Sequence, residues 1–478
     1  MSSQPPITAE QLAALPPEFR ALLQAVIDHY EARIAVLEAR IAELERELDR
    51  RPPKTPQNSS LPPSAQHPHA KPSSKKPRSK RNRGAQPGHP KHERTLIPVD
   101  QCADVADHRP TQCRGCGARL SGSDPEPLRH QVWELPEIKP LVSEHRLHRL
   151  TCARCGVSTC GELPPGVPRG QAGPRLVGFT ALAMGLFRQS RRKTALFLEQ
   201  VLNIPCSSGW VVKLQNQATA ALRPEYEGLA ERLPTQRQLN IDESPSKQGP
   251  LKTWLWTFVA KTFTVFALRG SRKAEELVAC VGPEFSGVVG CDRAKMYGGL
   301  LRQWCWAHLK RDFQALIDSP DNQAKRLGRD LLREVETMFG LWGRVRDGTL
   351  SRRGFKANMT PLRRAVEGLL LRGMFSGNRR MKGMCAELYR GRENLWTFVV
   401  VEGVEPTNNA AERALRHAVI WRKLSFGAQS AAGSRFVETM LTVVETCRQQ
   451  KNNPLDYVTA AIAAHFAGQK PPPLLATA

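Results

Sequence analysis

Three acidic residues stand where a metal-dependent enzyme acting on nucleic acid would need them. Asp242 follows a short apolar run in LNIDES, Asp292 ends a second run in GVVGCD, and Glu412 lies in TNNAAERALR near the start of an expected helix. Clustered carboxylates repel one another unless a hard cation lies between them, and Mg²⁺ takes oxygen ligands while keeping positions for water and phosphate. The three acids therefore predict phosphoryl transfer on DNA or RNA, with Mg²⁺ or Mn²⁺ bound by all three.

The choice of these three acids needs support from their context, because the chain has 45 acidic residues. The third acid is the most open to replacement. Glu412 could instead pair with Arg416 one helical turn further on. The third ligand would then come from Glu405, Glu438 or Glu445.

The elements that must position the first two acids begin near residue 237. The segments RQLNID, WLWTFVA and TVFALRG predict three short strands, SRKAEELVACVG predicts a helix, and SGVVGCD predicts a further strand that ends at Asp292. This order of strands, helix and acids resembles the ribonuclease-H-like fold, a mixed sheet flanked by helices. We expect this catalytic domain to occupy residues 235–450.

Glu412 is expected on a helix that begins behind Thr407, Asn408 and Asn409, which are good capping residues. The 119 residues between Asp292 and Glu412 exceed what such a core needs, and their basic, helical pattern predicts an insertion at about 315–400.

Before this insertion, Cys305 and His308 are spaced to share one helical turn. Such a pair is more often buried packing than half of a metal site, so its role stays open.

Two C-x-x-C pairs predict a zinc module over residues 96–165. Between the first pair, Cys113 and Cys116, and the second pair, Cys152 and Cys155, lie 35 residues. This spacing suits one tetrahedral Zn²⁺ held by four thiolates. Free buried thiols or a redox pair are the alternatives, although a redox pair needs only one C-x-x-C. Other side chains could replace one ligand, namely His108, His130, Cys102 and Cys160.

A heptad pattern over residues 18–50 predicts a parallel two-stranded coiled coil, and hence a homodimer. A lone amphipathic helix is the alternative. One core position of the heptad is mostly Ile and has Ile27, Ile34, Ile41 and Leu48. The other is mostly Leu and has Leu23, Tyr30, Leu37 and Leu44.

Between this helix and the zinc module, residues 51–95 read as a disordered basic linker. Its charges suit non-specific binding to DNA phosphates. The residues expected to contact DNA are Lys75, Lys76, Arg78, Lys80, Arg81 and Arg83.

Residues 170–230 read as helices around a turn, a possible helix-turn-helix DNA-binding region, with Ser207 or Ser208 capping the second helix. Residues 451–478 are expected to be a C-terminal tail. The chain as a whole is therefore expected to be a multidomain α/β protein, in which the coiled coil, linker, zinc module and helical region precede the catalytic core.

The charge balance favours a nucleic-acid partner. Lys and Arg number 70 against 45 Asp and Glu, a formal charge of +25, which suits an anionic polymer. No run of 18 apolar residues and no signal-peptide pattern occurs, so we expect a soluble intracellular protein rather than one bound to a membrane. The sparse cysteines fit a reducing compartment.

Several motifs together resemble the insertion-sequence 66 family of DDE transposases. The resemblance runs from about residue 20 to 465. The motifs are NSSLPPS, RGAQPGHPKHER, IDES, CDRAKMY followed by QWCWAHLKRDF, TNNAAERALRHAVIWRKLSFG, LTVVETCRQQ and NPLDY.

The resemblance implies a reaction and its partners. Water would attack at the element ends to free 3′ hydroxyls, which would then attack a target duplex. Asp242 would bridge two metal ions, while Arg413 and Arg416 would contact phosphates. The N-terminal regions would bind the terminal inverted repeats, with accessory proteins of the element as further partners. A cytoplasmic location at the bacterial nucleoid is expected.

Two alternatives remain at this stage. A ribonuclease-H-like nuclease would use the same carboxylates but stop after hydrolysis. A catalytically inactive, zinc-containing DNA-binding protein would carry the three acids only incidentally.

Overall fold

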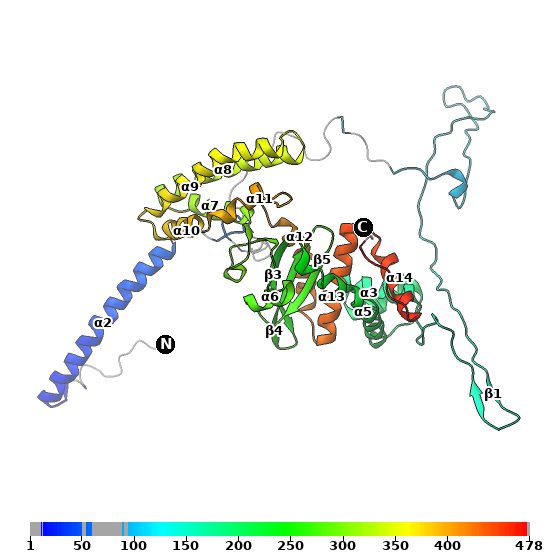
Figure 1. The fold of residues 1–478 in the computed structure, drawn as a ribbon, viewed down its shortest axis with the longest axis horizontal. Coiled ribbons are helices and arrows are strands. Elements are labelled where there is room, and N and C mark those ends of the chain that lie inside the picture. The colour runs from blue at the N-terminus through cyan, green and yellow to red at the C-terminus, as the bar shows by residue number, and fades with distance from the viewer. Residues whose placement is uncertain (1–10, 12, 50–53, 60–87, 90–93, 476–478) are drawn as a thin grey trace.

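The computed structural model describes residues 11, 13–49, 54–59, 88–89 and 94–475 (Figure 1). The six basic linker residues between Lys75 and Arg83 lie outside these ranges, so their expected contact with DNA stays a prediction.

A five-stranded mixed sheet forms the centre of the chain, with strand order β5-β4-β3-β6-β7. β3 pairs antiparallel with β4, and β4 pairs antiparallel with β5, whereas β3–β6 and β6–β7 are parallel. This confirms the expected α/β class. The strands are β3 (Gln238–Gln248), β4 (Leu251–Val259), β5 (Thr264–Arg269), β6 (Val288–Cys291) and β7 (Arg302–Trp304).

β6 is the strand that leads to Asp292, and all four of its residues are buried. A parallel strand covered on both faces is expected to be apolar throughout, as in the sequence VVGC. Gly290 is required here, because a Cβ at this position would lie 2.4 Å from Asn240 Oδ1 on β3. The two strands can therefore approach closely just before each reaches its acidic residue. The helix expected before β6 is α6 (Ala274–Val281).

The β5 edge of the sheet is closed by side chains of α13 (Ala431–Gln450). Backbone N–H groups of alternate β5 residues donate to side chains one helical turn apart. Leu268 donates to Glu438 Oε2 at 3.1 Å, Phe266 to Thr442 Oγ1 at 2.9 Å, and Thr264 to Thr446 Oγ1 at 3.2 Å. Two residues along a strand and about four residues along a helix cover nearly the same distance, so the three pairs stay in step.

Thr442→Val is expected to destabilise the protein by about 1–3 kcal/mol, because it leaves the buried Phe266 N–H without an acceptor. Thr439→Val is the matched control. Thr439 lies on the same helix and is equally buried, but its hydroxyl has no hydrogen-bond partner, so its replacement should be neutral or slightly stabilising. Denaturant midpoints measure both, and equal effects would show that the β5 contact contributes nothing.

A helical layer lies on the other side of α13 (Figure 1). It contacts the sheet domain directly, since Tyr226 donates to Phe266 O at 3.0 Å and Arg223 pairs with Glu438 at 2.7 Å. Ser207, rather than Ser208, caps the helix that begins at Ser208, because its side chain accepts from Trp210 N. The helices are α3 (Pro174–Gly185), α4 (Arg191–Leu202), α5 (Ser208–Ala230) and α14 (Pro454–Phe466).

α14 falls in the segment expected to be a tail. It packs against α3 and α5 through Val458, Ala461 and Ile462, all of which are buried. These residues are three and four positions apart, so they share one face of the helix.

The insertion between α7 and α12 is helical. α8 and α9 form a long hairpin beside the sheet domain (Figure 1), and Trp342 and Phe355 pack with Phe398, at 5.6 and 5.9 Å between ring centroids. Its helices are α8 (Asn322–Arg346), α9 (Arg352–Met374), α10 (Arg379–Arg390) and α11 (Thr397–Val400). The flanking helices are α7 (Trp306–Ile317) and α12 (Asn409–Ser425).

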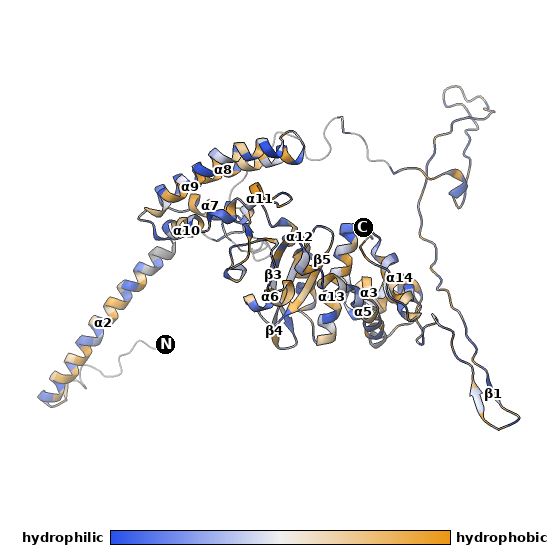
Figure 2. Cartoon of the chain, viewed as in Figure 1, coloured by the Kyte–Doolittle hydropathy of each residue, from blue (hydrophilic) through white to orange (hydrophobic). Residues whose placement is uncertain are grey.

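The N-terminal helix α2 spans Pro17–Asp49 and stands apart from the sheet domain (Figure 1). Apolar and polar residues alternate along it (Figure 2), and its heptad residues Tyr30, Ile34, Leu37 and Ile41 are exposed. Within the segment expected to be a linker, Asn58 is buried and donates to Asp318 Oδ2, directly after α7, at 3.0 Å.

Each C-x-x-C pair lies at the tip of a small hairpin. Gln112 and Arg119 flank the first tip, and β1 (Arg149–Thr151) and β2 (Ser158–Cys160) flank the second. The apolar side chains between the pairs are exposed, including Leu128 and Leu141. No helix in the described part of the chain is long and apolar enough to span a membrane.

Candidate functional site

Asp242 lies within β3, and Asp292 directly follows β6, the parallel neighbour of β3. The register pairs Asn240 with Gly290, and continuing it by two residues along each strand sets Asp242 beside Asp292. The carboxyl ends of parallel strands meet at one edge of a sheet, where ligands bind. The first two predicted acids therefore converge through the fold, although 50 residues separate them.

Glu412 lies in the first turn of α12, and its charge acts on Asp242. Asn408, expected as a side-chain cap, makes no cap hydrogen bond. Its side-chain amide donates to Ile241 O at 2.7 Å instead, and the residue is 2% exposed. Asn408 thus fastens the start of α12 to β3 directly before Asp242.

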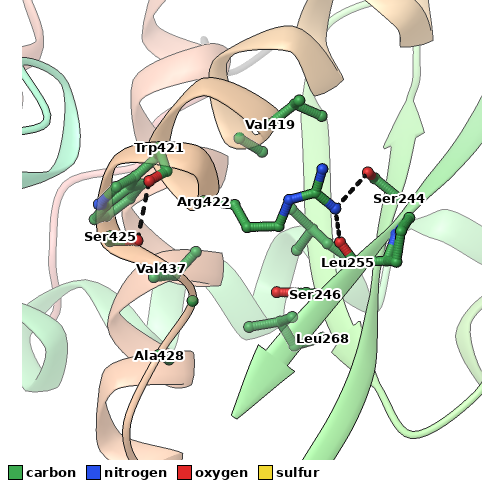
Figure 3. Close-up of a pocket in the computed structure, with 13 residues that line it drawn as sticks. Ser244, Ser246, Leu255, Leu268, Val419, Trp421, Arg422, Ser425, Ala428 and Val437 are labelled. Carbon is green, nitrogen blue, oxygen red and sulfur yellow. Dashed lines mark hydrogen bonds between the residues drawn. The ribbon is translucent and has the colours of Figure 1, made fainter. Parts of the chain in front are cut away.

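The far end of α12 is fastened to the same strand. Arg422 donates to Ser244 Oγ at 3.1 Å and to the carbonyl of Pro245, and these residues line a small pocket between helix and strand (Figure 3). Burial lowers the pKa of Arg422. With Asn408 at one end and Arg422 at the other, α12 has a fixed position over β3, which sets the place of Glu412.

The electrostatics of the site agree with this geometry. The pKa of Asp242 is raised to about 8, first by burial and then by the negative charges of Glu243, Asp292 and Glu412, while a hydrogen bond from the Glu243 N–H opposes the rise. A carboxyl group surrounded in this way releases its proton readily only when a cation arrives. The donor set is three carboxylates, so a hard divalent ion such as Mg²⁺ or Mn²⁺ fits it.

Glu412 faces α7 as well as the strands. Its Oε1 lies 3.5 Å from His308 Nδ1 and its Oε2 lies 3.7 Å from Arg311 Nη2. Among the described residues, no ion pair within 4.0 Å joins Glu412 to Arg416. Arg413 and Arg416 are exposed on the same helix, where solvent and an approaching polyanion can reach them.

The alternative third acids have other partners. Glu438 pairs with Arg223 and accepts from the β5 edge. Glu445 pairs with Arg448 on its own helix, and Glu405 accepts from Trp342 Nε1 at 3.2 Å. All three therefore have structural contacts away from the carboxylate pair.

Sequence reasoning missed a second network that orients Asp292. Arg272 pairs with Glu243, which also accepts from Tyr297 Oη, and Arg272 Nη2 lies 3.6 Å from Asp292 Oδ2. The other Asp292 oxygen accepts from Ala294 N at 2.8 Å. The Glu243 side chain is only 2% exposed, and burial is the main cause of its raised pKa. Glu243 and Tyr297 fall within the IDES and CDRAKMY motifs, so their identity was available in the sequence but their contact was not.

The two C-x-x-C turns, Cys113–Cys116 and Cys152–Cys155, are called cysteine knuckles below. They have matching backbone geometry. Gly117 N and Gly156 N donate to the carbonyls of Cys113 and Cys152, both at 2.9 Å, and both glycines have positive φ, +75° and +73°. Hydrogen bonds from the following backbone N–H groups, led by those of Cys116 and Cys155, lower the pKa of the first cysteine in each pair. Each knuckle is therefore shaped to hold a thiolate.

The described residues include one group of three or more metal-ligating side chains whose donor atoms all lie within 4.8 Å of one another. It consists of Cys305, His308 and Glu412. Cys113, Cys116, Cys152 and Cys155 are not among the groups of described residues that meet this distance. The sequence left the role of Cys305 and His308 open. The structure places both beside the carboxylate of Glu412.

Comparison with known proteins places the chain among transposases. The family described as "Transposase IS66 family" matches residues 180–435, which include all three acids, and a family of unknown function, DUF6444, matches residues 4–95.

Two uncharacterized proteins of Sinorhizobium fredii (strain NBRC 101917 / NGR234) are similar. One, y4qI, is 26% identical over 254 residues, 46% of this chain and 45% of that protein. The other, y4hP, is 24% identical over 404 residues, 74% of this chain and 71% of that protein. The chain thus matches less than half of the length of the first relative. Because the family match covers more than half of the 478 residues, this chain belongs to the IS66 family of transposases.

Proposed function

We propose that the chain is a DDE-type DNA transposase that binds the ends of its element, cleaves them and joins them to target DNA. The proposal takes the central sheet as a ribonuclease-H-like core with Asp242, Asp292 and Glu412 as its catalytic acids. The observation that carries it is the convergence of Glu412 on two aspartates of adjacent parallel strands, Asp242 within β3 and Asp292 directly after β6, close enough for its charge to raise the pKa of Asp242.

The residues of the chain would divide the work. Asp242, between the other two acids, would hold both ions, while Asp292 and Glu412 would each hold one. When bound, two Mg²⁺ ions would activate the attacking oxygen and stabilise the leaving oxygen. Arg272 would keep the Asp292 carboxylate oriented, and Asn408 would keep Glu412 over the strand. Arg413 and Arg416, exposed beside Glu412, would contact DNA phosphates.

The test is a strand-transfer assay with the full chain, Mg²⁺ and DNA taken from the two flanks of its coding region. Pre-cut ends with free 3′ hydroxyls should join a supercoiled plasmid. Cleavage without joining would support the ribonuclease-H-like nuclease instead. Specific binding without cleavage or joining would support the inactive DNA-binding protein.

The two cysteine knuckles would together bind one structural Zn²⁺ through Cys113, Cys116, Cys152 and Cys155. Their matching turns and lowered first-cysteine pKa values support this. The apolar side chains between the two knuckles are not buried, so the module has no apolar core to stabilise it. Metal binding would supply its folding free energy instead, about 10–16 kcal/mol in comparable small zinc peptides.

Cys113→Ser is therefore expected to lose one zinc per chain and to make residues 96–165 sensitive to protease, because the ion no longer holds the two hairpins together. Zinc content and limited proteolysis measure this. Cys206→Ser, at the turn between α4 and α5, is the control and should keep its zinc. An unchanged zinc content in Cys113→Ser would contradict the Cys₄ assignment.

The exposed heptad residues of α2 support pairing of two chains through a parallel coiled coil, which would hold two element ends together. Each chain would then contribute its own knuckles and its basic linker to DNA binding, at the nucleoid. Accessory proteins of the same element remain further partners of this proposal.

A further inference from the structure

The starts of two helices meet at the sulfur of Cys305. Cys305 is the residue at the N-terminus of α7, and its Sγ accepts from the backbone N–H of Asn408 at the start of α12, at 3.1 Å. Trp306 N donates to Pro406 O at 3.0 Å beside it. The segment leading into α12 is therefore bound to the first turn of α7, which carries His308.

Two polar atoms of this junction are buried without a hydrogen bond. His308 Nδ1 and Glu412 Oε1 face one another at 3.5 Å, and neither has a hydrogen-bond partner. Buried polar atoms in native proteins are nearly always satisfied, so each exception needs an explanation. A direct hydrogen bond does not account for this pair.

The spacing fits two ligands of one tetrahedral ion. Bonds of about 2.0–2.3 Å to Zn²⁺ put ligand atoms roughly 3.3–3.8 Å apart, and the distance between His308 Nδ1 and Glu412 Oε1 falls in this range. Cys305 Sγ completes a trio within 4.8 Å. The His308 and Glu412 side chains are 25% and 28% exposed, so the junction lies near the surface although its facing atoms are buried.

We propose that Cys305, His308 and Glu412 form a second metal site, selective for a borderline-soft divalent ion of the Zn²⁺ class and distinct from the site for Mg²⁺. Thiolate and imidazole ligands suit Zn²⁺, whereas Mg²⁺ requires oxygen ligands. Three protein ligands leave the fourth position for water, as in open zinc sites.

The site would fix Glu412 by a bond to metal. Binding through Oε1 leaves Oε2, which now faces Arg311 at 3.7 Å. If the proposed function holds, Glu412 would link the two kinds of metal site, and the Zn²⁺ would position an acid that serves the Mg²⁺ chemistry. The binding itself does not depend on that function, and it is measurable without DNA.

The experiment is metal titration of the full-length protein after removal of its metals, with Zn²⁺ for stoichiometry and Co²⁺ as the spectroscopic probe. The wild type should bind one more equivalent than Cys305→Ser and His308→Gln. The variants should lose affinity at this site by about a hundredfold or more, beyond the roughly 10- to 100-fold effect of an outer-shell partner. Cys305→Ser should also lose part of the thiolate-to-Co²⁺ absorption, whereas Glu412→Gln should keep that absorption with weaker binding.

Cys385→Ser is the matched control, since Cys385 is buried on α10 outside any group of ligating side chains, and it should match the wild type. Equal stoichiometry and spectra in the wild type, Cys305→Ser and His308→Gln would overturn the proposal. Displacement of the bound Zn²⁺ by a comparable concentration of Mg²⁺ would also overturn it. His308→Gln decides the question if Cys305→Ser does not fold. A strand-transfer failure in the wild type with the extra metal equivalent present would count against the proposed function alone.

Discussion

Asp292→Asn is expected to abolish metal-dependent DNA cleavage, by roughly a thousandfold or more. The change is nearly isosteric, and the side-chain oxygen can still accept from Ala294 N, which now donates at 2.8 Å. The substitution removes the charge that would hold a cation beside Asp242 and that now faces Arg272 Nη2 at 3.6 Å. Cleavage rates with Mg²⁺ and Mn²⁺ measure the loss, and DNA affinity should stay close to that of the wild type.

A charge-matched control separates this effect from a general loss of negative charge. Asp456 on α14 is exposed, and within the described ranges its one ion pair is with Arg175, at 3.5 Å. Asp456→Asn should therefore cleave at the rate of the wild type. If Asp292→Asn also retained full cleavage, Asp292 would not be a catalytic ligand.

The second large effect concerns the pH dependence of the metal-free protein. The raised pKa of Asp242, about 8, means that the folded chain holds this proton more tightly than the unfolded chain. The free energy of unfolding should therefore decrease as pH rises from about 4 to about 8, by at most about 1.4 kcal/mol per pH unit from this group. Asp242→Asn carries no titrating group here and should remove that part of the slope.

Denaturant unfolding at several pH values, with metal removed, measures the slope for both proteins. Mg²⁺ should restore the stability of the wild type near pH 8 and have little effect on Asp242→Asn. Calorimetric titration at pH 7 in buffers of different ionisation enthalpy should show about one proton released when Mg²⁺ binds the wild type. A wild type and an Asp242→Asn variant with the same slope would contradict the raised pKa.

The parts of the fold that the sequence predicted well are those governed by local periodicity. The three strands before α6 and the strand leading to Asp292 follow from alternation and from a buried apolar run, and the structure has all four, although β3 continues six residues past the predicted segment, to Gln248. The insertion was predictable because its helices have strong 3.6-residue periodicity. The packing of α14 was missed because small apolar residues in a terminal segment give a weak signal.

Contacts across long stretches of chain were not predictable. The bond between Asn408 and Ile241 joins residues 167 positions apart, and Asn408 as an ordinary helix cap was the simpler interpretation. The facing of His308 and Glu412 likewise depends on how α7 and α12 meet. The motifs contained these residues, but only the fold gives their distances.

The insertion of more than 100 residues ahead of α12 also has a consequence for protein synthesis. Asp242 and Asp292 leave the ribosome first, and Glu412 follows 120 residues after Asp292, about 6–24 s later at ordinary elongation rates of roughly 5–20 residues per second. A nascent chain in that interval has a nearly complete sheet without its third carboxylate. We therefore expect the proposed catalytic site to be incomplete until translation is almost finished, when α12 packs over β3.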